Sequence, residues 1–328
     1  MFFRGAEGVE QYQHIDWRNH GTAVLGIISG DENKFGVTGI CPEANVRAIS
    51  NYGAGQNTAK SIRDAADALR PGDILLLELH APGPRFNFVQ DGSTQNGFIA
   101  QEFWPADFAA IAYAAWKGII VVEAAGNGAE NFDDALYEKR PVGFPKSWRN
   151  PFNTANPQSG AIMVGAGAPP PGTHNVYYHG ADRSRLGFSN YGSRVDVQGW
   201  GQEVTSTGYG YLQWSENEDQ RYTDTFSGTS SASPVVVGVL GCLQGMLRAA
   251  DKPLLTPKTA RSILHQTGHP QQDEPGRPRT QRIGHRPDLK QAYNKLFASK
   301  PVIKDGKGSG KNDKGKGGGK GGAGIPKK

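Results

Sequence analysis

Two apolar stretches, Ile74-Leu-Leu-Leu77 and Ile119-Ile-Val-Val122, decide the fold class of this chain. Each is continuously apolar over the length of a strand, which is typical of parallel strands that are covered on both faces. Outward from them, predicted strands alternate with amphipathic helical stretches: Asn45–Ser50, Asn57–Leu69, Asp73–Leu79, Phe103–Lys117 and Ile119–Ala125. We therefore expect an α/β fold, with a doubly wound, mainly parallel sheet and helices on both faces.

Helical spacing predicts which face of each of the two helices packs inward. These faces are Ile62, Ala65, Ala66 and Leu69 on the first helix, and Phe108, Ile111, Ala112 and Ala115 on the second. Further along, the pattern predicts a buried strand at Ala161–Gly167 and helices at Ser230 to about Ala250, from Pro257, and at Pro287–Phe297. Pro234 is expected in the first turn of its helix, and Thr256 as the N-cap before Pro257.

The C-terminal stretch 301–328 differs from the rest of the chain. It holds ten Gly, eight Lys and two Asp, a net charge of +6, so the other residues carry +5 − 6 = −1. Such a segment cannot bury enough apolar surface to fold. We expect a globular domain at 1–300 and a disordered, low-complexity tail at 301–328, which serves either as a passive spacer or as a tether to an anionic surface.

Composition also excludes several classes of protein. No basic stripe interleaved with aromatic residues occurs outside the tail, so no nucleic-acid partner is expected. No run of 18 apolar residues exists, so we expect no membrane span, and the segment Met1–Gly8 has no apolar stretch of signal-peptide length. The two cysteines, Cys41 and Cys242, are too few for a disulfide framework and are expected to be buried free thiols.

Three segments carry residues suited to acyl transfer: His20-Gly-Thr-Ala-Val-Leu-Gly26, Glu123-Ala-Ala-Gly-Asn-Gly128 and Phe226-Ser-Gly-Thr-Ser-Ser-Ala-Ser-Pro234. They place a histidine on a helix of small residues, an asparagine on a turn after a buried strand, and a serine at the start of an apolar helix. Acyl transfer needs a nucleophile, a base near neutrality and donors aimed at the developing oxyanion. A helix N-terminus supplies free N–H groups for the last of these.

In the order His, Asn, Ser, these segments resemble the subtilisin-like (S8) serine peptidase family, over about Ile15 to Tyr293. The resemblance implies a subtilisin-like fold and a serine endopeptidase that hydrolyses peptide bonds in protein or peptide substrates. It implies His20 as general base, Ser230 as nucleophile, and Asn127 as oxyanion donor beside the Ser230 backbone N–H. It also implies action outside the cell and no required cofactor, and calcium as a structural ion is left open.

The segment Leu79-His-Ala-Pro-Gly83 occupies the place of the strand that backs the substrate pocket in that family. The resemblance therefore implies Leu79, Ala81 and Gly83 as substrate-binding residues. No metal ligands are assigned, because the carboxylates in long loops fit a calcium site and a solvated surface equally well: Asp133, Asp134, Glu216, Glu218 and Asp219.

The chain departs from the family pattern at the triad aspartate. The family has this residue at the end of a core strand some thirty residues before the histidine, and only 19 residues precede His20 here. Asp16 is the one aspartate among them. We interpret the domain as lacking the first core strand, with an upstream segment that supplies the aspartate.

Three other interpretations compete with an active peptidase. An α/β-hydrolase would need Gly-x-Ser-x-Gly, but Ala232 occupies the last position and the histidine precedes the serine. A nucleotide-binding loop at Gly165-Ala-Gly167 fails because three prolines follow it. The remaining alternative is a catalytically impaired fragment, or pseudo-peptidase, that keeps the fold and a peptide-binding cleft.

Overall fold

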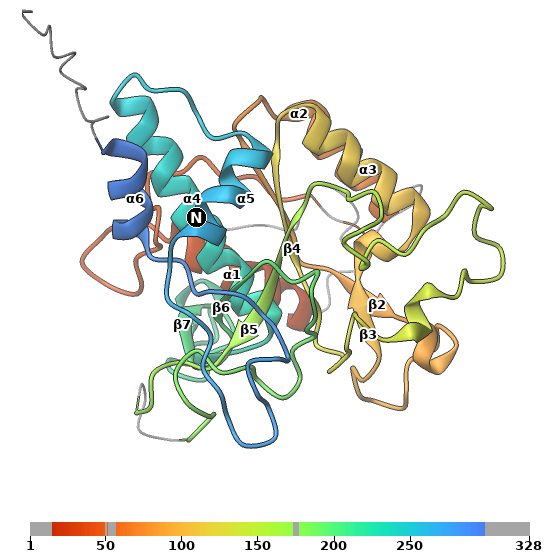
Figure 1. Ribbon diagram of the computed structural model, residues 1–328. Coiled ribbons are helices and arrows are strands. Elements are labelled where there is room, and N and C mark those ends of the chain that lie inside the picture. Colours follow the sequence, from red (N-terminus) through yellow and green to blue (C-terminus); the bar gives the residue numbers. More distant parts are fainter. Residues whose placement is uncertain (1–14, 50, 52–56, 173–176, 299–328) are drawn as a thin grey trace, which may run out of the picture. The chain divides into compact units, whose positions relative to one another are not determined.

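The computed structural model describes residues 15–49, 51, 57–172 and 177–298, except for the side chains of residues 15 and 16 (Figure 1). The predicted tail, 301–328, therefore lies outside the described residues. The larger elements are α1 (Ile15–Ser29), α2 (Thr58–Ala68), α3 (Pro105–Trp116), α4 (Thr229–Ala249), α5 (Pro257–Gln266) and α6 (Leu289–Phe297), with eight strands.

Four strands form one parallel sheet in the order β1-β4-β5-β6. They are β1 (Ile74–Leu77), β4 (Ile120–Ala124), β5 (Ile162–Gly167) and β6 (Val197–Trp200). The residues of β4 and β5 are all buried, as the continuous apolar runs predicted. The mainly parallel sheet expected from the sequence is thereby confirmed.

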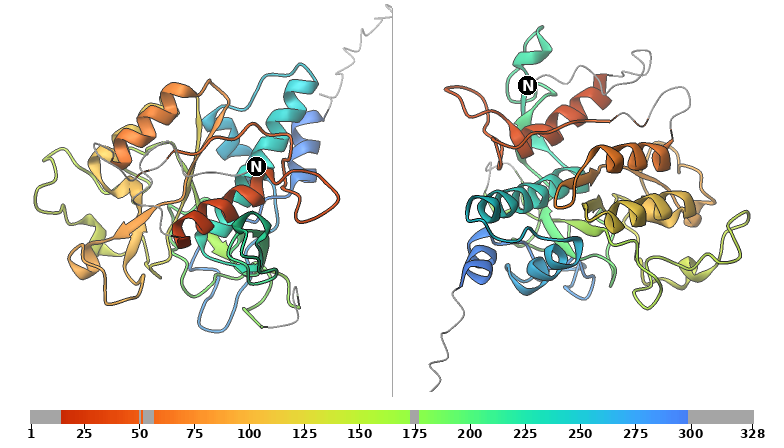
Figure 2. Two further views of the ribbon diagram at one scale, coloured as in Figure 1. Left: turned by 180° about the vertical axis from the view of Figure 1, so that it is seen from behind. Right: turned by 90° about the horizontal axis from the view of Figure 1, so that it is seen from above.

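The helices α2 and α3 lie side by side and cover one face of the sheet (Figure 2). Their buried residues join those of the strands in one apolar cluster: Ile62, Ala66, Leu77, Ala110, Ile111, Ala114, Ile119, Val121 and Ala161. Asn57 caps α2 by accepting a hydrogen bond from the backbone N–H of Lys60 at 2.9 Å. These contacts hold α2 and α3 against one face of the sheet.

Helix α4 packs across all four strands of the sheet, on the side opposite α2 and α3. It is the one helix among the described residues with the length and hydropathy to cross a membrane, but 61% of its most apolar window is buried inside the protein. A core helix of a soluble domain passes the same test of length and composition. The burial of α4 against the strands accounts for its apolar sequence.

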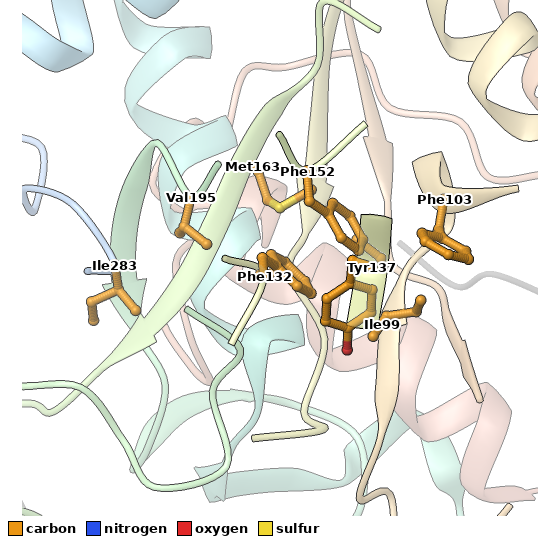
Figure 3. Close-up of a cluster of buried hydrophobic side chains, with 10 residues drawn as sticks. Ile99, Phe103, Phe132, Tyr137, Phe152, Met163, Val195 and Ile283 are labelled. Carbon is orange, nitrogen blue, oxygen red and sulfur yellow. The ribbon is translucent and has the colours of Figure 1, made fainter. Parts of the chain in front are cut away.

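An aromatic cluster fills the space beside β5 (Figure 3). Phe132 and Phe152 stack with ring centroids 3.9 Å apart, and Tyr137 meets Phe152 edge to face at 5.3 Å. Phe103 contributes a further ring, and it is fully buried. Aromatic pairs in such arrangements contribute about 0.5–1.5 kcal/mol each beyond the area they bury. The cluster holds the loops that follow β4 against the sheet.

Two antiparallel pairs lie outside the main sheet. Strands β2 (His80–Pro82) and β3 (Phe98–Ala100) pair beside the end of β1, and β7 (Val204–Thr207) pairs with β8 (Tyr222–Phe226) beside α1. Four short 3₁₀ helices complete the described elements: η2 (Pro84–Phe86), η3 (Gln101–Phe103), η4 (Ala135–Glu138) and η5 (Glu218–Gln220).

The predicted strand at Asn45–Ser50 is wrong for the residues that the structure describes. Residues 45–49 contain only a single bridge residue, Ile49, and Ser50 lies outside the described part. A strand forms only where a neighbouring strand satisfies its backbone groups. Strand β1 pairs with β4 on one edge, and no strand among the described residues pairs with its other edge.

Two smaller expectations about helices are also wrong. The buried residues of α3 are Asp107, Ala110, Ile111 and Ala114. Ile111 is buried as predicted, whereas the other three predicted residues each lie one position after a buried one. The helix begins at Pro105, after η3, and the small Ala110 and Ala114 allow close packing. Pro234 is the sixth residue of α4 and lies in its second turn, because the helix begins at Thr229.

Candidate active site

A cavity of about 610 Å³ brings together residues from eight separate segments of the chain. His20, Asn127 and Ser230, the three residues singled out by the sequence, all line it. The other lining residues are Glu78, Leu79, His80, Gln95, Asn96, Ala124, Phe188, Gln202, Tyr209, Tyr211, Thr223, Thr225, Phe226, Ser227, Gly228 and Thr229. Segments that are far apart in the sequence therefore converge on one place.

Ser230 is the second residue of α4, at the end of the helix where backbone N–H groups are free. The preceding cap is Gly228, whose φ of 106° is a conformation that favours glycine. The hydroxyl of Ser231 fixes this turn by donating to the carbonyl of Trp200 at 2.9 Å or to that of Gly228 at 3.0 Å. The Ser230 N–H thus lies at the positive end of the helix dipole.

Asn127 follows β4 on a turn between two glycines, and a larger residue at either position would be strained or would clash. Gly126 has a φ of 95°, and a Cβ at Gly128 would lie 2.2 Å from the carbonyl oxygen of Phe98. The Oδ1 of Asn127 accepts hydrogen bonds from both the backbone N–H and the hydroxyl of Thr229, each at 2.9 Å. This orients the amide so that its Nδ2 is the group that faces the cavity.

The Asn127 Nδ2 group has two hydrogens, and one of them is already used. It donates to the Oε1 of Gln95 at 3.1 Å, which leaves the second for a ligand in the cavity. The backbone N–H of Asn127 donates to His80 Nδ1 at 3.2 Å. Hydrogen bonds therefore hold both the side chain and the backbone of Asn127 before any substrate binds.

His20 lies on α1, and hydroxyl groups of β7 hold this helix in place. Ser206 Oγ donates to the Ala23 carbonyl at 2.6 Å, and Thr207 Oγ1 donates to the Thr22 carbonyl at 2.8 Å. The imidazole meets the ring of Phe226 edge to face, with centroids 5.7 Å apart. Burial lowers the pKa of His20 to about 4.

No hydrogen bond joins His20 to a carboxylate, or to Ser230, among the residues that the structure describes. The side chain of Asp16, one helical turn before His20, lies outside the described side chains. His80 also lines the cavity, and burial, followed by the proximity of His20, lowers its pKa to about 4 as well. Both imidazoles are therefore neutral at pH 7.

Of the three residues predicted to bind substrate, the structure places one on the cavity. Leu79 lines the cavity, whereas Ala81 and Gly83 are not among its lining residues. Ala81 pairs with Ile99 between β2 and β3, and the Gly83 N–H donates to the Gly97 carbonyl at 2.8 Å. The backbone of this stretch is thus engaged in the β2–β3 pair.

The carboxylates considered for calcium have protein partners at several positions. Asp133 accepts hydrogen bonds from the backbone and hydroxyl of Ser193, and Asp134 caps η4 and pairs with Arg85 at 2.9 Å. No group of three or more His, Cys, Asp or Glu side chains suited to a metal occurs within the described ranges. Asp133 and Asp134 therefore act as hydrogen-bond acceptors of the loops they belong to.

Sequence reasoning missed three groups that shape the cavity. Thr229 orients the Asn127 amide, Gln95 binds its Nδ2 group, and Glu78 directly follows the apolar strand β1 and lines the cavity with Ser230. The isolated charge after four apolar residues of β1 was the one signal that could have drawn attention to Glu78. Gln95 belongs to a loop without any periodic pattern, so nothing in the sequence marks it.

A hydroxyl at a helix N-terminus, an imidazole and an oriented amide on one cavity beside a doubly wound sheet define the class of serine hydrolases. The comparison with known families gives the particular family: the model of the subtilase family matches residues 5–284, and the chain belongs to that family of serine proteases.

Similar proteins include proteases whose names place them inside the cell and outside it. An intracellular serine protease of Paenibacillus polymyxa is 27% identical over 77% of this chain and 62% of its own length. An extracellular protease of Xanthomonas campestris pv. campestris is 26% identical over 76% of this chain, and the chain spans 36% of that relative. A thermophilic serine proteinase of Bacillus sp. (strain AK1) is 30% identical over 71% of this chain and 44% of its own length.

Solved structures share the fold at low sequence identity. The patellamide maturation protease PatA matches with a TM-score of 0.56 and 20% identity, over 84% of this chain and 83% of that one. The PatG macrocyclase in complex with peptide matches with a TM-score of 0.57 and 20% identity, over 88% and 72% of the two chains. The subtilisin-like fold expected from the sequence is confirmed by these likenesses.

Proposed function

We propose that this chain is a serine endopeptidase in which Ser230 is the nucleophile, His20 the general base and Asn127 the oxyanion donor. The convergence of these three residues on one cavity is the observation that carries the proposal. Membership of a serine protease family supports a peptide or protein as the substrate. The predicted substrate-binding role of Leu79 is part of the proposal, because Leu79 lines the same cavity.

The proposed reaction follows from the atoms that face the cavity. Ser230 Oγ attacks the carbonyl carbon of the scissile bond while its proton passes to His20, and the carbonyl oxygen becomes an oxyanion. That oxyanion accepts hydrogen bonds from the free hydrogen of Asn127 Nδ2 and from the Ser230 backbone N–H. His20 then gives the proton to the leaving amine, and water hydrolyses the acyl-enzyme.

As a general base, His20 needs a carboxylate partner, and no described residue supplies one. With a pKa near 4, His20 is a weak proton acceptor, and a carboxylate hydrogen-bonded to its ring would raise that pKa. In this proposal an upstream segment supplies the carboxylate by pairing with the edge of β1 that no described strand occupies. The structural calcium left open by the sequence has no part in this reaction.

A peptide-binding protein without cleavage activity is the second candidate. It is favoured by one observation, that His20 makes no hydrogen bond to Ser230 or to a carboxylate within the described part of the chain. Such a protein would bind an unstructured peptide in the same cavity and leave it intact.

Hydrolysis of denatured casein tests the two candidates. The endopeptidase proposal predicts new peptide ends that appear with the chain and not with Ser230→Ala, and a reduced rate with His20→Ala and Asn127→Ala. Binding of casein peptides without new ends, equally by the chain and by Ser230→Ala, would overturn it in favour of the binding protein.

A further inference from the structure

Glu78 is an acidic residue placed directly against the proposed nucleophile. It follows the last residue of β1 and lines the same cavity as Ser230 and His20. Its Oε1 is in a short contact with the hydroxyl of Ser233, which lies three residues after Ser230 on the same side of α4. The carboxyl therefore faces the first turn of the helix that carries Ser230.

The proton count at Ser233 indicates the protonation state of Glu78. A serine hydroxyl has one proton, and Ser233 Oγ has two acceptors in reach, the Thr229 carbonyl at 2.8 Å and Glu78 Oε1. A helical serine commonly donates to the carbonyl four residues earlier. When Ser233 does so, its hydroxyl has no proton left for Glu78, and the contact between the two side chains is then a hydrogen bond only if Glu78 carries a proton and donates it to Ser233.

The surroundings of Glu78 also favour the neutral acid. No cationic side chain forms an ion pair with it among the residues that the structure describes. Burial raises the pKa of Glu78 to about 8, and the hydroxyls of Ser233 and Ser230 only partly offset this. Its second oxygen, Oε2, is buried and has no hydrogen-bond partner within the described part of the chain.

We propose that Glu78 is a positioning residue that keeps Ser230 reactive only while it is a neutral acid bonded to Ser233. The inference rests on the proposed function, because it concerns the nucleophile of that reaction. In the neutral state Oε2 is a weak acceptor, and the Ser230 hydroxyl is free to turn toward His20. The carboxyl then packs against α4 without adding charge to the cavity.

Ionisation of Glu78 would lower the reactivity of Ser230 in two ways. The carboxylate Oε2 becomes a strong, charge-assisted acceptor, and the Ser230 hydroxyl donates its hydrogen bond to it. Its negative charge also opposes the oxyanion that forms beside Ser230. The other titratable groups on the cavity wall are His20, His80, Tyr209 and Tyr211, and the two imidazoles stay neutral above pH 6.

Infrared spectroscopy tests the protonation state without any need for activity. The difference spectrum between the chain and Glu78→Gln should contain the carbonyl band of a protonated carboxyl at pH 6, and this band should disappear by pH 10. A carboxylate signal already present at pH 6 would overturn the inference.

The rate at which a fluorophosphonate labels Ser230 tests the consequence for the nucleophile. We expect the rate to fall by about tenfold per pH unit above pH 8, as a single titrating group requires. Glu78→Gln should keep its rate through this range.

The possible results separate the two proposals. If no pH gives labelling that depends on Ser230, the proposed function fails, and the infrared result still decides the state of Glu78. If Ser230 is labelled but Glu78→Gln shows the same alkaline fall, the inference on Glu78 is wrong. A rate that instead rises through pH 8 and is lost in Glu78→Gln would also overturn it, and would make the carboxylate a proton acceptor.

Discussion

Replacement of Thr229 by valine should slow the reaction at Ser230 by a modest and calculable factor. The Thr229 hydroxyl accepts from the Gly126 N–H at 3.2 Å and donates to Asn127 Oδ1 at 2.9 Å. Valine removes this hydroxyl but keeps the backbone N–H of residue 229, which donates a second hydrogen bond to Oδ1 at 2.9 Å. The Asn127 amide thus loses one of its two restraints at that oxygen.

One neutral hydrogen bond contributes about 0.5–1.5 kcal/mol, so Thr229→Val should lower the rate of Ser230 labelling by roughly 2- to 12-fold. Asn127→Ala removes the oxyanion donor itself and should cost about 10²–10³-fold. The Gly126 N–H left unpaired in Thr229→Val should also lower the free energy of unfolding by about 1–3 kcal/mol.

The assay is the second-order rate constant of fluorophosphonate labelling, measured beside a urea denaturation curve for each variant. Folded Thr229→Val should fall between the unchanged chain and Asn127→Ala. A Thr229→Val rate within a factor of two of the unchanged chain, or an Asn127→Ala rate that does not fall, would refute the reasoning about the oriented amide.

Three further predictions concern stability and reactivity. Arg194→Met should lower the free energy of unfolding by about 3–5 kcal/mol in urea titrations, because Glu102 and Asp196 are buried and lose a paired cation; a loss below about 1 kcal/mol would contradict this. The free energy of unfolding should fall by about 1.4 kcal/mol per pH unit between pH 6.5 and about pH 4 on account of His20, whose pKa is lowered to about 4, because the unfolded chain binds that proton more readily. His20→Asn should remove this share of the slope in the same titration. Burial raises the pKa of Cys242 to about 11, so at pH 8 iodoacetamide should alkylate it much more slowly than it alkylates free cysteine, as followed by mass spectrometry; equal rates would count against this.

The sequence was most informative where one local pattern decides the outcome. The runs at Ile74–Leu77 and Ile119–Val122 could be recognised as strands of a covered sheet because every residue in them is apolar. The cap at Thr256 and the helix start at Pro257 follow from side-chain and backbone chemistry within four residues. Such features depend little on the rest of the fold.

Features that depend on distant partners could not be read in the same way. Residues 45–49 have the composition of a strand but lack a strand neighbour among the described residues. The face of α3 was misplaced because its packing against α2 sets the rotation of the helix. The place of Glu78 in the site depends on a tertiary contact, because β1 brings this residue to the start of α4.

The candidate site shows the same division. His20, Asn127 and Ser230 stand in recognisable local motifs, and the structure brings them to one cavity. The groups that hold them, such as Gln95 and the hydroxyl of Ser206, come from loops and strands with no motif of their own. Their roles depend on tertiary contacts.

Mass spectrometry of the folded chain after treatment with a fluorophosphonate tests the central claim, that Ser230 is an activated nucleophile. The account predicts one phosphonyl group on the peptide that contains Ser230, and none on the folded Ser230→Ala variant. A folded chain that stays unlabelled, or one that is labelled equally in Ser230→Ala, would contradict it.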